Sequence, residues 1–272
     1  MQYVKKILFA ACLFACWLLL LGLQGRQPTV LFDQGHGQRF LIDKQGSLHL
    51  SMLADIFRDY GFTVKTNEGK ISHETLKGAD VLMISGAFAP LASSEIDSLV
   101  DFVEGGGTLC VMLHIGQPVA GLLWRFNVLI SNGVIREQEN LINGKQKDFF
   151  ITRLASHPLM DGLERFAVHG SWALNATDKH GREKHGKIIA QTSSTAWIDL
   201  NRDGQFNETY AMQSYGVVVT GTFGKGRFVA FGDDAIFQNT FLEKENMALG
   251  KNLVKWLSNS SIMPTPMLNE LK

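Results

Sequence analysis

The chain has 272 residues, of which 45% are hydrophobic, and its 26 basic residues balance 26 acidic ones, so the formal net charge is zero. A chain of this length can bury one sizeable core, and it contains no repeat or low-complexity segment, so a single large domain is expected. No stripe of Lys or Arg is present that could neutralise the phosphates of a nucleic acid, and nucleic acid is not an expected partner.

The N-terminus combines two lysines, Lys5 and Lys6, with an uncharged and mostly apolar run from Ile7 to Leu23. This pattern is typical of a signal sequence or a signal anchor. The residues before Arg26 make a poor small-x-small cleavage site, which favours an uncleaved transmembrane helix within residues 1–25 over a cleaved signal peptide. With both lysines on the cytoplasmic side, we expect a single-pass inner-membrane protein whose remaining chain lies in the periplasm.

Apolar, β-branched runs alternate with amphipathic stretches in the first part of the chain and again near its end. The runs predict strands at 29–32, 62–65, 81–84, 108–113 and 226–232, and the amphipathic stretches predict helices at 50–60, 72–77, 93–103 and 249–257. Ser47 is the expected N-cap of the first of these helices, and Ser93 or Ser94 that of the third. Strands of this kind, alternating with helices, predict a parallel sheet covered on both faces.

The segment 127–215 shows short strands, turns and polar loops, and is interpreted as a β-rich elaboration packed on the same sheet. We therefore expect one α/β domain over 26–257, followed by a flexible tail over 258–272 that contains Pro264 and Pro266.

Several segments together resemble the class I glutamine amidotransferase-like superfamily. They are Leu31–Gly37, Ala79–Ile84, Ser94–Glu95 with the glycine run at 105–107, Ser156–Leu159, Gly224–Asp233 and Asn246–Leu257. The likeness is strongest to an uncharacterised, membrane-associated bacterial branch, akin to the auxiliary subunit of gliding-motility ABC transporters. The resemblance implies a flavodoxin-like, doubly wound and mostly parallel sheet, partners among envelope proteins or an ABC-transporter-like complex, and no established reaction.

The amidotransferase nucleophile is missing from the position that the resemblance assigns to it. Catalytic members carry a cysteine on the sharp turn after a central strand, and here that turn is His114-Ile115-Gly116. Cys110 lies inside the predicted strand, where a thiol acts as a small packing group. No Gly-x-Ser-x-Gly motif supplies a serine instead, so amidotransferase chemistry is not expected.

Polar residues follow the predicted parallel strands, at the edge where open α/β sheets bind ligands. The candidate ligand-binding residues are Asp33, Gly35, His36, Gly37, Ser85, Asp233 and Asp234, and the candidate catalytic residues are Asp33, His36, His114 and Asp233. The alternative is that the aspartates only cap loops and helices.

The segment from Asp199 resembles the first two-thirds of an EF-hand loop, with oxygen side chains at Asp199, Asn201 and Asp203. Ala211 stands where the closing Glu would be, so weak calcium binding is the most that is expected, and no other cofactor is implied. A hairpin turn on Asp203-Gly204 is the alternative.

Two functional hypotheses follow. The first is a membrane-anchored, extracytoplasmic, non-catalytic binding or assembly module of an envelope complex. The second is a hydrolase of a cell-envelope or carbohydrate substrate, in which Asp33 or Asp233 and His36 or His114 supply acid–base catalysis.

Overall fold

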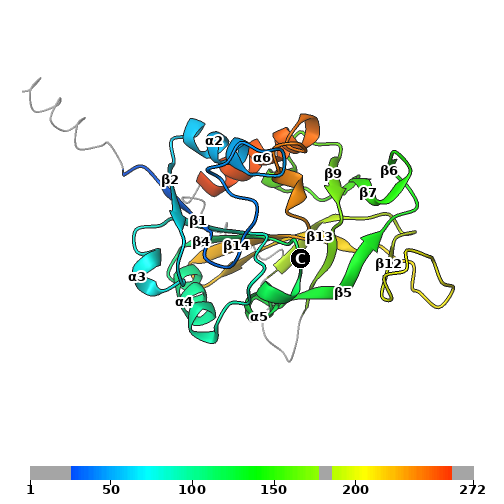
Figure 1. Ribbon diagram of the computed structural model, residues 1–272, viewed down its shortest axis with the longest axis horizontal. Coiled ribbons are helices and arrows are strands. Elements are labelled where there is room, and N and C mark those ends of the chain that lie inside the picture. Colours follow the sequence, from blue (N-terminus) through cyan, green and yellow to red (C-terminus); the bar gives the residue numbers. More distant parts are fainter. Residues whose placement is uncertain (1–25, 178–185, 259–272) are drawn as a thin grey trace, which may run out of the picture.

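The computed structural model describes residues 26–177 and 186–258. In this part of the chain, eleven strands form one mixed sheet with the order β12-β5-β10-β13-β14-β4-β3-β1-β2, and β11 and β8 extend it from β13 (Figure 1). The strands are β1 (Thr29–Asp33), β2 (Thr63–Asn67), β3 (Val81–Ser85), β4 (Thr108–Met112), β5 (Val128–Arg136), β8 (Arg153–Leu154), β10 (Trp172–Ala176), β11 (Gly186–Gln191), β12 (Trp197–Ile198), β13 (Gly216–Phe223) and β14 (Gly226–Phe231).

A second, three-stranded sheet and five helices complete the described structure, together with three short 3-10 turns. The small sheet contains β6 (Leu141–Ile142), β7 (Lys145–Ile151) and β9 (Phe166–His169). The helices are α2 (Ser51–Asp59), α3 (His73–Leu76), α4 (Ser93–Glu104), α5 (Ala120–Arg125) and α6 (Lys244–Ser258), and the turns are η1 (Gln117–Val119), η2 (Pro158–Met160) and η4 (Ala235–Phe237).

One half of the main sheet is parallel, as the alternation of strands and helices predicted. β2, β1, β3, β4 and β14 pair in parallel in that order. Every residue of β1, β3 and β4 is buried, because helices cover both faces of these strands. Cys110 in β4 is fully buried, which confirms that its thiol packs in the core.

The other half of the sheet overturns the predicted fold class. The segment 127–215 adds β5, β8, β10, β11 and β12 to the same sheet as antiparallel strands, and β13 joins them to β14. Within the described ranges, the main sheet therefore has six antiparallel and four parallel strand pairings. The fold is a β-rich mixed sheet, and the expected flavodoxin-like, doubly wound sheet is wrong.

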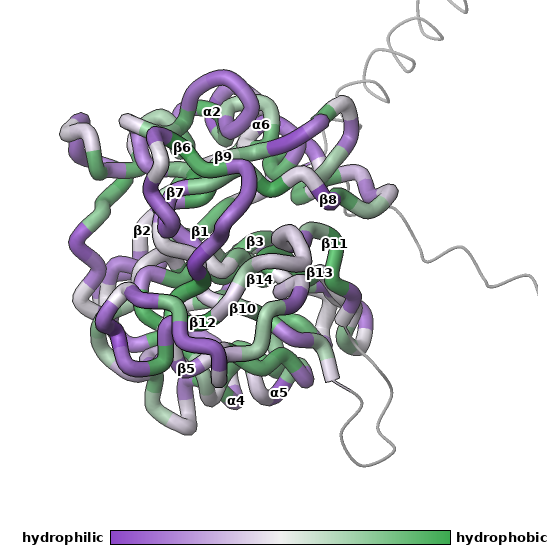
Figure 2. Tube along the Cα trace, turned by 90° about the vertical axis from the view of Figure 1, so that its right-hand side faces the viewer, coloured by the Kyte–Doolittle hydropathy of each residue, from purple (hydrophilic) through white to green (hydrophobic). Residues whose placement is uncertain are grey.

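The main sheet lies between two apolar layers, one on each of its faces. On one face, Val30 and Phe32 of β1 pack in a cluster with α2, α6 and the three-stranded sheet, and on the other face Leu31 packs in a cluster with α4 and α5. Figures 1 and 2 show these layers on opposite sides of the sheet. Alternate residues of one strand point to opposite faces, so neighbouring residues at a strand end also face different layers.

The predicted N-caps of two helices are wrong. α2 begins at Ser51 with Leu50 as its N-cap, and α4 begins at Ser93 with Ala92 as its N-cap, without a capping side chain in either case. In α4, Glu95 caps the N-terminus of the helix instead, because its Oε2 accepts the Ala92 backbone N–H at 2.9 Å. An acid at the third helical position can satisfy this N–H even where the cap residue has no oxygen.

No helix within residues 26–177 and 186–258 has the length and apolar character needed to cross a bilayer. The predicted transmembrane helix is thus not part of the described structure, and the run from Ile7 to Leu23 lies outside it, as do residues 259–272 of the predicted tail.

Candidate functional site

The candidate residues lie at one edge of the parallel half of the sheet. Asp33 and Ser85 end β1 and β3, and His114 and Asp233 follow β4 and β14 by two residues. These four strands are parallel neighbours, so their carboxyl ends open on the same side. The structure nevertheless divides the side chains into two separate groups.

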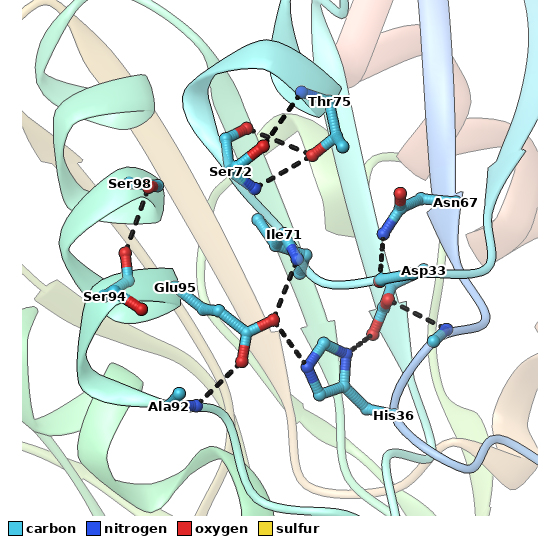
Figure 3. Close-up of polar contacts among 12 residues, drawn as sticks. Asp33, His36, Asn67, Ile71, Ser72, Thr75, Ala92, Ser94, Glu95 and Ser98 are labelled. Atoms are coloured by element: carbon cyan, nitrogen blue, oxygen red, sulfur yellow. Dashed lines mark hydrogen bonds and ion pairs between the residues drawn. The ribbon is translucent and has the colours of Figure 1, made fainter.

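The first group, the His36 cluster, consists of Asp33, His36, Gln38 and Glu95. Figure 3 shows the ring of His36 between Asp33 and Glu95. The His36 ring uses both nitrogens: Nδ1 lies 2.7 Å from Asp33 Oδ2 and Nε2 lies 3.1 Å from Glu95 Oε1. Gln38 Nε2 donates to the same Asp33 oxygen at 2.6 Å. Only 4% of His36 is exposed, so neither ring nitrogen is available to a ligand.

Electrostatic interactions shift the pKa values of His36 and Glu95 toward their charged forms. Burial alone lowers the pKa of His36, but the bond to Asp33 and the charges of Asp33 and Glu95 outweigh it, so the pKa is raised. Burial acts on Glu95 in the opposite sense, yet the backbone N–H groups of Ala92 and Ile71, followed by His36, hold the pKa of Glu95 below its usual value. An imidazolium between two carboxylates therefore ties the loop after β1 to the start of α4.

Two glycines of the loop after β1 are needed for the conformation of its backbone. A Cβ on Gly35 would lie 2.2 Å from the carbonyl oxygen of Gly69, and Gly37 has a φ of +71°. Between them, the His36 carbonyl accepts the backbone N–H groups of Phe88 and Ala89. The glycines are thus explained by packing and turn geometry, without a bound ligand.

The second group, the His114 cluster, consists of His114, Asp233 and Asp234. His114 Nδ1 lies 3.1 Å from Asp234 Oδ1, and the side chain is 39% exposed between the rings of Phe40 and Phe88. Its Nε2 has no hydrogen-bond partner among the described residues. The bond to Asp234 is the largest influence on the pKa of His114 and raises it, against the opposing effect of burial. This histidine can exchange a proton with a bound molecule.

Asp233 is not available in the same way. It is 2% exposed, its Oδ1 accepts the Ala235 N–H at 2.9 Å, and its Oδ2 accepts the His169 N–H at 2.5 Å. Burial, and then the charge of Asp234, raise the pKa of Asp233 to about 7. Its bond to β9 points it toward the layer of the three-stranded sheet, whereas His36, which is bonded to Asp33, contacts Glu95 of α4 on the opposite face. The three residues share an edge but do not form one acid–base group.

Two buried oxygens at this edge have no hydrogen-bond partner in the described part of the chain, Ser85 Oγ and Asp234 Oδ2. Asp234 Oδ2 lies against Gly86, where a Cβ would come within 2.5 Å of it, and Gly86 has a φ of +59°. Gly86 therefore makes room for the carboxylate that orients His114.

Glu95 is the residue of this region that sequence reasoning missed as a site residue. It lies in the first turn of α4 and is 59 residues from His36 in the chain. Its position three residues after Ala92 signals a cap, but nothing local indicates that its other oxygen meets an imidazole.

Most side-chain oxygens of the calcium candidates are bonded to other groups of the protein. Asp199 Oδ2 accepts Arg136 Nε at 2.7 Å, and Asn201 Nδ2 donates to Asp203 Oδ2 at 2.7 Å. Gly204 has a φ of +77°, but within the described ranges no strand follows it before β13, so the alternative of a hairpin on Asp203-Gly204 is not observed either. No group of three His, Cys, Asp or Glu side chains in the described ranges is arranged to hold a metal. An arginine thus neutralises Asp199, and calcium would have to displace it.

Comparison with solved structures shows the same fold in proteins of very different sequence. The mmIFT52 N-terminal domain is similar at 15% identity and a TM-score of 0.68, over 86% of this chain and 99% of that one. The cytoplasmic protein STM1381 from Salmonella typhimurium LT2 (14% identity, TM-score 0.52, 84% and 99% covered) and a putative ThuA-like protein from Parabacteroides merdae ATCC 43184 (10%, 0.52, 89% and 93%) are further neighbours. At these identities the likeness concerns the fold alone.

These comparisons correct the resemblance inferred from the sequence motifs. The neighbours are of the IFT52 and ThuA-like type, and the mixed sheet departs from the amidotransferase pattern, so the assignment to the class I glutamine amidotransferase-like superfamily is wrong. No curated protein matches the sequence. The family profile that does match covers residues 50–254, and the chain accordingly belongs to the family described as a domain of unknown function, DUF4350.

Proposed function

We propose that the chain is a non-catalytic binding or assembly module, held at the membrane by its N-terminal apolar run with the folded domain on the extracytoplasmic side. The observation that carries this proposal is that three of the four candidate catalytic residues, Asp33, His36 and Asp233, are bonded to other groups of the protein. Both ring nitrogens of His36 are bonded to carboxylates, and both oxygens of Asp233 accept backbone N–H groups. Groups held in this way stabilise loops and have no free atom to offer a substrate.

The second candidate function is hydrolysis of a cell-envelope or carbohydrate substrate, and one observation favours it. His114 is half-exposed, with Nδ1 held by the buried Asp234 and Nε2 without a described partner. A carboxylate that orients one imidazole nitrogen leaves the other positioned for proton transfer, as general acid–base catalysis requires.

Complementation separates the two candidates. In a strain that lacks the gene, the His114→Ala and Asp234→Asn variants are expected to restore function, because a binding module does not need the proton-transfer pair. A photoreactive residue at the exposed position Leu200 should cross-link the same envelope partner in wild type and in His114→Ala. Loss of function in both His114 and Asp234 variants, with unchanged stability and unchanged cross-linking, would overturn the proposal in favour of the hydrolase.

Topology is tested independently. An alkaline phosphatase fused after Arg26 should be active outside the cytoplasm, and the fusion should sediment with membranes. Recovery of the intact protein in the cytosol would contradict the membrane-anchored part of the proposal.

A further inference from the structure

The amino ends of the parallel strands lie together at the edge of the main sheet opposite to the His36 and His114 clusters. Thr29 of β1 pairs with Thr63 of β2. Thr108 of β4 pairs with Val81 of β3 and with Arg227 of β14. Because these strands begin at the same level, the segments that precede them form one surface, which we call the amino edge. It consists of residues 26–28, 60–62, 77–80, 104–107 and 224–225.

The described chain enters the domain at the amino edge, and Asp80 fixes the entry point. Asp80 Oδ1 accepts Arg26 Nη2 at 2.5 Å, and Asp80 Oδ2 accepts the Thr29 backbone N–H at 2.6 Å. Arg26 also donates through Nη1 to the Gly78 carbonyl at 2.8 Å. Figure 1 shows the first described residues, in blue, reaching the sheet beside β2 and β1. Residue 26 is therefore held against the loop that precedes β3.

The connection between this entry point and the proposed anchor is short. The apolar run ends at Leu23, and an extended chain advances at most about 3.6 Å per residue, so Arg26 lies no more than about 11 Å from the end of the run. The run from Ile7 to Leu23 has about the minimum length that spans a bilayer, which places Leu23 at the outer boundary of the hydrocarbon. The headgroup layer beyond that boundary is about 5–8 Å thick. Under the proposed anchoring, only a few ångströms can separate the amino edge from the headgroups.

The exposed side chains of the amino edge suit a lipid surface and do not require a charged one. Tyr60 is 42% exposed and presents an aromatic ring with a polar hydroxyl, a combination that is enriched at bilayer interfaces. Lys77 and Lys225 are exposed, but so are Glu104 and the neighbouring Asp59 at the end of α2. Because these charges balance, the short connection to the anchor, and not attraction to anionic lipid, sets the contact.

We propose that the amino edge rests on the phospholipid headgroups of the extracytoplasmic membrane surface, and that the opposite edge, with the His114 cluster, faces away from the bilayer. Strands rise about 3.3 Å per residue, so the five-residue strands β1, β3 and β4 separate the two edges by about 17 Å. His114 then faces molecules in the aqueous compartment. The inference rests on the proposed membrane anchor and adds to it the surface that meets the lipid.

Photocross-linking in vesicles tests this orientation. The full-length chain is reconstituted in vesicles of phosphatidylethanolamine and phosphatidylglycerol, with a photoreactive amino acid at Tyr60, Lys77 or Ala89 in turn. Ala89 is the matched control, because it is exposed at the opposite edge, where its N–H bonds to the His36 carbonyl. Cross-links to lipid should be severalfold more frequent at Tyr60 and Lys77 than at Ala89. Equal or more frequent cross-links at Ala89, or none at either amino-edge position, would overturn the orientation.

A lengthened connection tests the role of the tether. Ten flexible Gly/Ser residues inserted between Gly25 and Arg26 add a root-mean-square span of about 16–19 Å, which allows the domain to leave the headgroup layer. Lipid cross-linking at Tyr60 should then fall severalfold. The same segment added after Lys272 is the control and should leave cross-linking unchanged. Full cross-linking after the insertion would show that the surface itself adheres to lipid, and would overturn the tethered contact.

Flotation of the same samples separates this inference from the proposed function. A chain that does not float with the vesicles would contradict both the membrane anchor and the orientation. A chain that floats but cross-links lipid preferentially through Ala89 would contradict the orientation alone.

Discussion

His36 and His114 stand in similar local settings but behave as different kinds of residue. Each follows a parallel core strand, and each has Nδ1 bonded to an aspartate. The difference is the second nitrogen: Glu95 of α4 occupies Nε2 of His36, whereas Nε2 of His114 has no described partner and its side chain is 39% exposed. A histidine bonded to an aspartate at a strand end can therefore be a buried structural residue or an accessible proton donor. The outcome depends on whether a residue of the covering helix bonds to its second ring nitrogen.

The largest expected effect comes from removing the bonds of His36 to Asp33 and Glu95. His36→Ala leaves Asp33 and Glu95 buried without their shared imidazolium, and removal of one partner of a buried ion pair costs about 3–5 kcal/mol. Urea unfolding should show this loss in the free energy of unfolding. The comparison is His114→Ala, which should cost less, because the half-exposed ring leaves a space that water can fill beside Asp234. Equal losses in the two variants would remove the distinction between the clusters.

The next effect concerns the backbone of the same loop. Gly35→Ala would place a Cβ 2.2 Å from the Gly69 carbonyl oxygen, and the shift needed to relieve this contact should cost about 1–3 kcal/mol. Gly69→Ala is a matched control, because its Cβ would meet nothing within 4 Å. Thermal unfolding should show a lower midpoint for the first variant and little change for the second. An unaffected Gly35→Ala protein would mean that the loop does not need its observed path.

A smaller effect appears in the pH dependence. The pKa of His36 is raised in the folded state, so its stabilising contribution is fully present below the unfolded value of about 6.5 and is lost as pH rises through the folded value. The stability advantage of wild type over His36→Gln should therefore shrink as pH rises above about 6.5. Urea unfolding of both proteins across this range measures it. A difference that grows with pH would show that His36 is neutral in the fold.

The smallest expected effect leaves stability almost unchanged and reports on His114 itself. In an NMR titration, the pKa of His114 should lie above the ordinary histidine value because of its bond to Asp234, and it should fall in Asp234→Asn. The protein should remain folded throughout. An identical titration in wild type and variant would show that the bond does not form in solution.

Part of the fold could be predicted from local pattern. The parallel strands β1, β3, β4 and β14 and the helices between them follow from continuous apolar runs and helical periodicity, and the burial of Cys110 follows from its place inside a strand. The segment 127–215 could be recognised as β-rich, but its strand directions could not be predicted, because period-two alternation is the same in parallel and antiparallel strands.

The candidate site, like the fold, could be predicted only in part. That Asp33, His114 and Asp233 end or follow parallel strands, and so share one edge of the sheet, could be argued from the chain order. Their separation into two clusters could not, because it depends on which face each side chain takes and on partners far along the chain.

The sequence by itself determined the parallel core strands, the turn-forming glycines and the polar loops at the strand ends, since these depend on interactions between neighbouring residues. Only the tertiary structure decided that β13 and its antiparallel neighbours extend the same sheet. It also decided that Glu95, 59 residues away in the chain, bonds to His36, and that Asp233 bonds to β9 on the opposite face. The physical reason is that periodicity and turn chemistry are local, whereas strand pairing and burial are settled by contacts between segments that only the complete core brings together.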